Sequence, residues 1–418
     1  MRRKQLSKGI FLISTLFFYF LTISCNAQKV SSKEKPEIIV GANQLDKYID
    51  LLKGKNVAVV GNNTSVIFKN GKSNSNYQHL VDSLLTLGIK VTKVFSPEHG
   101  FRGDADAGEN LTDAIDSKTG LPIVSLYGEN KNPGQKQIYN YRKPTPEHLR
   151  NIDVVVFDIQ DVGVRFYTYI STLHNIMEAC AENGIPVIVL DRPNPNGNYI
   201  DGPVLEKQSK SYAGLGAIPI VYGMTIGEYA KMTNGEKWLK DGVQCDLKVI
   251  PLKNYTHNST YSLPLRPSPN LPNDKSINLY ASLCMFEGTN VSSGRGTEMQ
   301  FQIFGSPYLP KDKYNFTFTP QPNFGSKTPE NMGQECYGLD LSKTENLSSL
   351  NLTWLIDAYN SSAQKDKFFN KESFNKLAGN TKLKEQIEQG LTFEEIKATW
   401  QKDLITFKKA REKYLIYK

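Results

Sequence analysis

The sequence predicts an α/β protein, with a Rossmann-like parallel sheet domain and a smaller second α+β domain. Five short runs rich in β-branched residues are apolar on both faces, which is typical of strands in a parallel sheet covered on both sides. Helical patterns alternate with these runs, as they do in βαβ units. The 418 residues also exceed what one hydrophobic core usually supports, so two domains are expected.

The chain begins with an expected export signal. Residues 1–24 are predicted to be a signal peptide, because four basic residues precede an apolar stretch that is too short for a stable membrane span. Two ways of processing the signal stay open: Cys25 becomes the lipidated N-terminus of a lipoprotein, or ordinary cleavage falls before Gln28. Residues 25–37 are polar and are expected to form a tether. We therefore expect an exported bacterial protein, either periplasmic or membrane-anchored through a lipid.

The first half of the chain is expected to hold the sheet. Strands are predicted at 56–60, 89–95, 121–126, 152–159 and 185–190. Helices are predicted at 43–53, 77–87, about 145–150, and 168–182. Glycine follows two of these helices, at Gly88 and Gly184, where a left-handed residue commonly ends a helix.

The second half has a different pattern. Thr225 and Glu228 form a capping box that is expected to open a helix. Further elements are predicted as strands at 247–250 and 299–304 and as helices at 349–360 and, after a second capping box at Thr392, to about 410. We place a Rossmann-like catalytic domain at 38–225 and a smaller α+β domain, which completes the cleft, at 226–418.

Charge and motif content exclude several classes of protein. The formal charge of +8 falls to +4 without the four basic residues of the signal, and no dense Lys/Arg block remains, so no nucleic-acid partner is expected. Four later cysteines show no C-x-x-C spacing and are expected to be buried small hydrophobes. Dinucleotide, P-loop and G-x-S-x-G signatures are absent from the sequence. We expect no cofactor and no metal.

Polar residues follow each predicted strand, and Glu98 and His99 follow the second. Open α/β sheets bind ligands outside the carboxyl ends of their strands, so these residues are expected at one crevice. Catalytic candidates are Glu98, His99, Asp158 and Asp161. Candidates for binding the substrate are Asn62, Arg102, Tyr127, Glu129, Gln160, Arg165, Tyr167, Asp191, Arg192, Glu287, Arg295 and Glu298.

These residue types suit the cleavage of a glycosidic bond. That reaction needs a carboxylic acid to protonate the leaving oxygen and a second group to attack or stabilise the anomeric centre. Glu98 is the natural acid. The second group stays open, and its candidates are Glu129, Asp158, Asp161, Glu287 and Glu298. An arginine at the crevice would bind a substrate carboxylate in a bidentate manner.

Five longer segments resemble one known family. They are SPEHGFRG (96–103), FDIQDVGVRFYTYISTL (157–173), VLDRPNPNG (189–197), PIVYGMTIGE (219–228) and FEGTNVSSGRGTE (286–298). From about residue 40 onward the chain is similar to the exo-β-N-acetylmuramidases, exported bacterial glycosidases once grouped as a domain of unknown function.

The resemblance implies an exo-acting enzyme of cell-wall turnover. Such an enzyme removes β-1,4-linked N-acetylmuramic acid from the non-reducing ends of peptidoglycan fragments, in a cleft between a Rossmann-like domain and a smaller one. It also implies that Glu98, in the E-H-G-F segment, is the catalytic residue. Retaining, inverting and substrate-assisted routes all stay open. Two other functions are weighed against it: a non-catalytic surface lipoprotein that binds oligosaccharide, and a metal-dependent carbohydrate esterase.

Overall fold

A computed structural model describes residues 36–69, 76–103, 109, 111–127 and 142–417. The expected signal peptide, Cys25 and nearly all of the expected tether lie outside these residues. Glu37–Lys418 form one compact unit. Within the described residues, no helix has the length and apolar character needed to cross a membrane.

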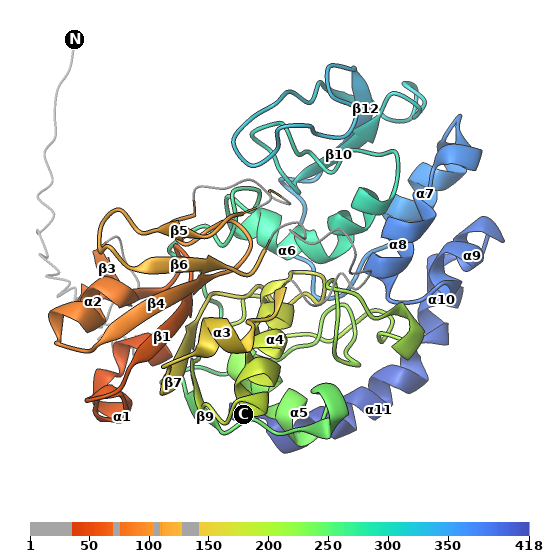
Figure 1. Ribbon diagram of the computed structural model, residues 1–418. Coiled ribbons are helices and arrows are strands. Elements are labelled where there is room, and N and C mark those ends of the chain that lie inside the picture. The colour runs from red at the N-terminus through yellow and green to blue at the C-terminus, as the bar shows by residue number, and fades with distance from the viewer. Residues whose placement is uncertain (1–35, 70–75, 104–108, 110, 128–141, 418) are drawn as a thin grey trace, which may run out of the picture. The chain divides into compact units, whose positions relative to one another are not determined.

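Seven strands form one sheet in the order β5-β6-β4-β1-β7-β8-β9 (Figure 1). The strands are β1 (Val57–Gly61), β4 (Val91–Ser96), β5 (Ala114–Ile115), β6 (Pro122–Ser125), β7 (Val154–Asp158), β8 (Val187–Leu190) and β9 (Leu247–Ile250). A separate small hairpin pairs β2 (Val66–Phe68) with β3 (Tyr77–His79).

The pairing confirms the predicted parallel sheet. From β6 to β9 every neighbouring pair is parallel, and only β5, which pairs with β6, is antiparallel. The first strand of the chain lies in the middle, with later strands added on one side and then on the other. That is the order of a doubly wound sheet, and its direction reverses between β1 and β7.

Alternation along β1 explains how both faces are covered. Val57 and Val59 join a core with α1 (Ile49–Leu52) and α2 (Leu80–Thr86). Ala58 and Val60 point the other way, into a core with α4 (Tyr169–Glu182) and α5 (Ile226–Gly235). Successive side chains of a strand face opposite sides of a sheet, so five consecutive buried residues require cover on both.

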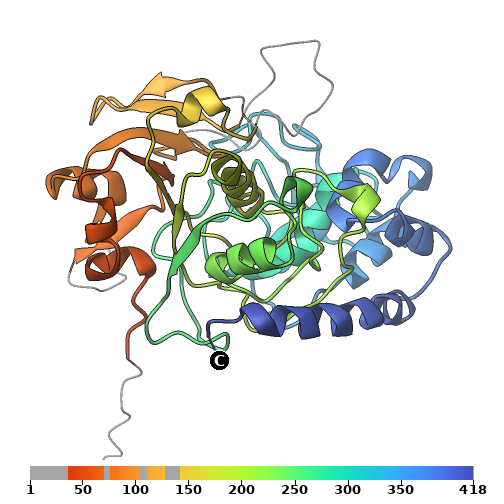
Figure 2. The same cartoon turned by 60° about the horizontal axis from the view of Figure 1, so that its bottom comes forward.

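The second region combines helices with a small antiparallel sheet of order β10-β12-β11. Its strands are β10 (Ile303–Ser306), β11 (Phe316–Phe318) and β12 (Cys336–Asp340). Its helices are α6 (Asp274–Leu283), α7 (Thr353–Ser361), α8 (Lys371–Ala378), α9 (Lys382–Glu388), α10 (Phe393–Thr399) and α11 (Gln401–Arg411). Figure 2 shows α11 beside α5, and the Tyr414 hydroxyl just after α11 donates to Glu236 just after α5 (2.7 Å).

Several predicted boundaries are corrected. The sheet continues to β9, and α5 packs in the core on one face of it. The predicted domain boundary at 225/226 therefore divides the sheet domain instead of marking its end. The helix expected over 43–53 is broken into two 3₁₀ turns and the four-residue α1. The helix expected from Tyr77 begins at Leu80, since β3 takes the first residues. Helix α3 (Pro146–Leu149), α4 and the Thr225 capping box that opens α5 are as predicted.

The four cysteines of the described chain, Cys180, Cys245, Cys284 and Cys336, are free and buried. This confirms their predicted role as small apolar side chains.

Candidate active site

A tight turn presents Glu98 at the carboxyl end of β4. The Gly100 N–H donates to the Pro97 carbonyl (3.2 Å), and His99 between them has a φ of 71°. A positive φ is uncommon for a residue other than glycine and often marks a functional turn. The chain thus reverses its direction immediately after Glu98, which leaves the carboxylate at the edge of the sheet.

Hydroxyl groups hold the Glu98 carboxylate. The Thr168 hydroxyl, one residue before α4, donates to Glu98 Oε2 (2.7 Å). The Tyr127 hydroxyl also hydrogen-bonds to Glu98. Burial, and then the charge of Glu98, raise the pKa of Tyr127 above its usual value, so the phenol stays protonated and donates. The carboxylate is therefore oriented by neutral donors from two different elements.

Glu98 lines two cavities that share Glu287 and Arg295. The smaller cavity has a volume of about 140 Å³. It is also lined by His99, Tyr127, Phe166, Tyr167, Thr168, Tyr169, Ser268, Tyr280, Cys284, Phe301 and Leu377. The larger cavity, of about 530 Å³, is also lined by Glu109, Phe286, Thr289, Val291, Ser292, Ser293 and residues 325–330. Chemical groups of both halves of the chain thus meet at Glu98.

Glu287 and Arg295 form an ion pair at the junction of the two cavities. Arg295 Nε donates to Glu287 Oε1, and the guanidinium carbon lies 5.2 Å from the centre of the Phe301 ring. Burial opposes the charge of Arg295, but the Glu287 carboxylate raises the pKa of Arg295 above its usual value. Both side chains keep about a quarter of their surface exposed, at 23% and 28%, so the pair remains in reach of a ligand.

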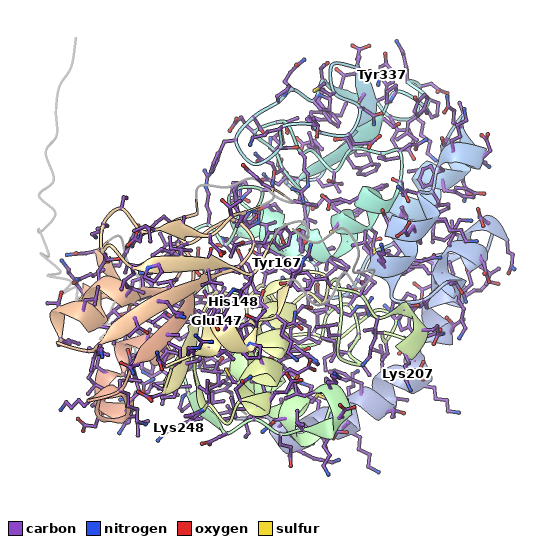
Figure 3. The ribbon with its side chains drawn as sticks, in the orientation of Figure 1. Glu147, His148, Tyr167, Lys207, Lys248 and Tyr337 are labelled. Carbon is purple, nitrogen blue, oxygen red and sulfur yellow. The ribbon has the colours of Figure 1, made fainter. Side chains whose placement is uncertain are left out.

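Aromatic rings form the wall of the smaller cavity. Tyr167, labelled in Figure 3, packs edge-on against Tyr169 of α4 (4.9 Å between ring centres) and Tyr280 of α6 (5.8 Å). Tyr280 in turn meets Phe301 at 4.8 Å. The hydroxyls of Tyr167 and Tyr169 donate to the Pro267 carbonyl, which fixes the two rings. These packed rings form a wall that joins α4 to α6.

Arg142 packs on two tyrosine rings, one of which belongs to this site. The guanidinium carbon of Arg142 is 4.1 Å from the centre of the Tyr127 ring and 3.9 Å from that of Tyr212. The Tyr212 hydroxyl shares a hydrogen bond with Thr172 of α4 (2.7 Å). Contacts therefore run without a break from α4 through Tyr212, Arg142 and Tyr127 to the Glu98 carboxylate.

The expectation that Asp158 faces the crevice is corrected. Arg192 donates to both of its carboxylate oxygens (2.6 and 2.8 Å), and the pair is buried, with side-chain exposures of 3% and 0%. Burial alone would lower the pKa of Arg192, but Asp158 raises it above its usual value. The Thr64 hydroxyl accepts a hydrogen bond from the Gln160 N–H (3.0 Å) beside them. The place where the strand order reverses is thus filled by the protein's own side chains.

Asp161 and Asp191 are also buried rather than at the cavities. Asp161 accepts hydrogen bonds from the Gly163 N–H (2.7 Å) and the Tyr222 hydroxyl, and burial raises the pKa of Asp161 to about 7. Asp191 accepts from the Tyr417 hydroxyl (2.6 Å) and from the first turn of α5, and burial raises its pKa to about 6. Both carboxylates stabilise loops.

Other candidates also have structural contacts. Arg165 is fully buried, and its donors reach the carbonyls of Pro203, Ile218 and Leu377 (2.8–3.1 Å). Arg102 pairs with Asp82 and Asp116 in a separate cavity of about 230 Å³.

Asn62 lies beneath the site, where its amide donates to the Tyr169 hydroxyl (3.0 Å). The Gln160 amide is tied to two backbone carbonyls. Glu298 is exposed and lines neither cavity, and Glu129 lies outside the described residues.

The structure therefore unites Glu98, His99, Tyr127, Tyr167, Glu287 and Arg295 from the predicted set. The prediction missed Thr168, Arg142 and the segment 325–330. Thr168 falls within a segment singled out by resemblance, so that segment held a usable signal. Arg142 and 325–330 have no distinctive local pattern. Among the described residues, no group of three His, Cys, Asp or Glu side chains is placed to hold a metal ion.

Comparisons with known proteins agree along the whole described chain. Residues 57–275 match the model of the N-terminal domain of exo-β-N-acetylmuramidase NamZ, and residues 278–417 match that of its C-terminal domain. The peptidoglycan β-N-acetylmuramidase NamZ of Bacillus subtilis is 38% identical over 434 residues, which cover 98% of this chain and all of that protein.

Solved structures from Bacteroides fragilis have the same fold. One crystal structure of a DUF1343 family protein is 44% identical with a TM-score of 0.81, and a second is 30% identical with a TM-score of 0.75. Each alignment covers 91% of this chain and 99% of the other. The chain belongs to the NamZ family of exo-β-N-acetylmuramidases, a family of glycoside hydrolases.

Proposed function

We propose that this protein releases N-acetylmuramic acid from the non-reducing ends of β-1,4-linked peptidoglycan fragments during cell-wall turnover. One observation carries the proposal: Glu98, held by hydroxyl donors, lies where an aromatic-lined cavity and a larger polar cavity meet, with Glu287 and Arg295 in both. An acid, a second carboxylate and a cation are the groups that hydrolysis of an acidic sugar requires.

Glu98 is proposed as the general acid. In its protonated form it donates a proton to the glycosidic oxygen, so the bond from that oxygen to the anomeric carbon breaks and the shortened fragment leaves as an alcohol. The hydroxyls of Thr168 and Tyr127 fix the orientation of the carboxyl group throughout. After the leaving group departs, the Glu98 carboxylate accepts the proton of the water molecule that completes hydrolysis.

Glu287 is proposed as the second group. Of the five carboxylates considered for this role, Asp158 and Asp161 are buried and Glu298 is outside the cavities, whereas Glu287 lines both. Its carboxylate, held in place by the ion pair with Arg295, is proposed to stabilise the positive charge that develops at the anomeric carbon. Arg295, partly exposed beside it, is proposed to bind the lactyl carboxylate that distinguishes muramic acid.

The site of action is proposed to lie outside the cytoplasm. The pattern of residues 1–24 supports export, and Cys25 supports a lipid anchor. Metabolic labelling with a clickable fatty acid tests the anchor: label is expected on the wild-type protein and not on Cys25→Ser. Unlabelled, soluble periplasmic wild-type protein would favour cleavage before Gln28.

The activity is tested with the purified protein and a MurNAc-GlcNAc disaccharide, with release of free MurNAc followed by mass spectrometry. Glu98→Gln is expected to lower kcat by about 10²- to 10⁴-fold while the melting temperature stays the same. Glu298→Gln, an exposed glutamate outside both cavities, is the matched control and is expected to keep full activity.

Two outcomes would contradict this function. Unchanged release of MurNAc by Glu98→Gln would remove Glu98 from the chemistry. Release of acetate without free MurNAc, and its loss in EDTA, would point instead to a metal-dependent carbohydrate esterase that acts as a deacetylase.

A further inference from the structure

Phe324 is a large exposed apolar side chain that directly precedes residues 325–330, which line the larger cavity at Glu98. It keeps 60% of its surface exposed, which for an aromatic ring leaves a large apolar area in water. Single exposed apolar residues are common, so exposure alone decides nothing. Ile405, for example, is 68% exposed in the middle of α11 and lines neither of the cavities at Glu98. Phe324 differs from Ile405 in two ways: a hydrogen-bonded turn holds its backbone, and the residues that follow it line a cavity.

A rigid turn displays Phe324. Asn323 and Ser326 exchange two backbone hydrogen bonds (3.0 and 3.1 Å), so Phe324 and Gly325 form the tip. Gly325 has a φ of 100°, and its carbonyl accepts a hydrogen bond from the buried Asn270 amide (2.7 Å). A Cβ at this glycine would lie 2.8 Å from Pro269, so the turn is seated closely on the chain below it. The ring is therefore held out by a fixed backbone.

The residues after this turn line the larger cavity. Gly325 and Ser326 are buried in its wall, and Lys327, Thr328 and Glu330 are exposed at its edge. Lys327 Nζ also donates to Glu109 across that edge (3.1 Å). An exposed aromatic ring thus directly precedes, in the chain, a wall with several polar side chains in the cavity that also contains Glu98 and Glu287.

This combination matches the chemistry of a sugar chain. A pyranose has apolar C–H groups on its face, which pack on an aromatic ring, and hydroxyls at its edge, which need polar partners. We propose that Phe324 is a stacking platform for a distal sugar of the substrate, beyond the sugar attached to the scissile bond. The proposal rests on the proposed function, since it assigns the larger cavity to the part of the fragment that leaves.

The test compares two substrates of different length. The disaccharide MurNAc-GlcNAc ends before a distal sugar, whereas the tetrasaccharide MurNAc-GlcNAc-MurNAc-GlcNAc extends past it. Each loses one terminal MurNAc, so initial rates of MurNAc release can be compared directly. Phe324→Ala is expected to lower kcat/KM for the tetrasaccharide by about 3- to 10-fold, through a higher KM, and to leave the disaccharide unchanged.

Two further variants complete the experiment. Phe324→Tyr keeps the ring and is expected to retain the wild-type rate on both substrates. Ile405→Ala removes an equally exposed apolar side chain elsewhere and is expected to change neither rate.

Equal losses on both substrates, or no loss on either, would overturn the role of Phe324 while MurNAc release by the wild type leaves the proposed function intact. Absence of MurNAc release by the wild type on both substrates would instead overturn the proposed function.

Discussion

Two carboxylates at the same edge of the sheet have opposite surroundings. Asp158 at the end of β7 is buried against a guanidinium, and Glu98 after β4 faces a cavity and accepts hydrogen bonds from hydroxyls. Both residues follow apolar strands, so the sequence pattern around them is alike. The difference arises from Arg192, which lies 34 residues after Asp158 and reaches it through the fold.

Removing Arg192 tests the structural role of that pair. Arg192→Met is expected to lower the free energy of unfolding by about 3–5 kcal/mol, because Asp158 becomes an unpaired buried charge. The double variant Asp158→Asn, Arg192→Met is expected to recover part of the loss. Urea denaturation measures both, and a single variant as stable as the wild type would contradict this account.

Arg142 is expected to act as a positioning residue, since it contacts Tyr127 and is absent from the residues that line either cavity. Arg142→Met is expected to lower kcat by about 10-fold with little change in KM, and Arg142→Lys, which keeps the charge, to recover part of it. The neighbouring Lys143→Met, which loses ion pairs to α4 instead, serves as the control. A change confined to KM would mean that Arg142 contacts the substrate.

At the scale of elements, the segment after α11 returns to the first sheet. The Tyr417 hydroxyl accepts a hydrogen bond from the Leu252 N–H (2.8 Å) and donates to Asp191 (2.6 Å), just past the ends of β9 and β8. Glu228 of α5 accepts from the N–H groups of Ile416 and Tyr417 (2.8 and 3.2 Å). These contacts join the last described residues to a sheet formed by the first half of the chain.

Tyr417→Phe is therefore expected to destabilise the fold by about 1–3 kcal/mol, because the buried Leu252 N–H loses its acceptor and the buried Asp191 carboxylate loses one of its donors. Tyr414→Phe, at a less buried residue whose hydroxyl donates to the part-exposed Glu236, is expected to have a smaller effect. Chemical denaturation at neutral pH compares the two. Equal effects would show that burial of the Tyr417 contacts does not matter.

Prediction from sequence succeeded for elements with local signals. The buried runs of β1, β4, β7 and β8 and the capping box of α5 are fixed by neighbouring residues, and they lie where expected. Helix α6 was missed, because it follows a Pro/Asn-rich passage and its burial depends on packing against distant residues. The same holds for the site: Glu98 is marked by its turn, whereas the roles of Asp158 and Arg142 depend on partners far away in the chain.

At the scale of the whole molecule, buried ionisable groups give the stability an unusual dependence on pH. Burial raises the pKa of Asp161 to about 7 in the folded protein, against an ordinary value of 3.8. Between these values the folded state binds a proton that the unfolded state releases, so this contribution stabilises at low pH and is lost as the pH rises towards 7. Burial of His79 and His174 lowers their pKa values to about 4, and they act in the opposite direction over an overlapping range.

A difference measurement isolates Asp161. The free energy of unfolding is measured by urea denaturation at pH 5 and pH 8 for the wild type and for Asp161→Asn. The variant is expected to gain stability relative to the wild type at the higher pH, since asparagine has no charge to bury. A difference that is the same at both pH values would show that Asp161 does not titrate between them.

The buried Arg192 guanidinium has a consequence for the evolution of new activities on this scaffold. Doubly wound sheets commonly bind ligands in a crevice outside the carboxyl ends of their strands, at the point where the strand order reverses. Here the buried Arg192 guanidinium lies at that point, paired with Asp158 at the end of β7 and donating to the Val66 carbonyl. Under the proposed function the reacting carboxylate follows β4 instead, in a cavity also lined by residues of the second half of the chain, so substitutions there are expected to change specificity without disturbing the sheet.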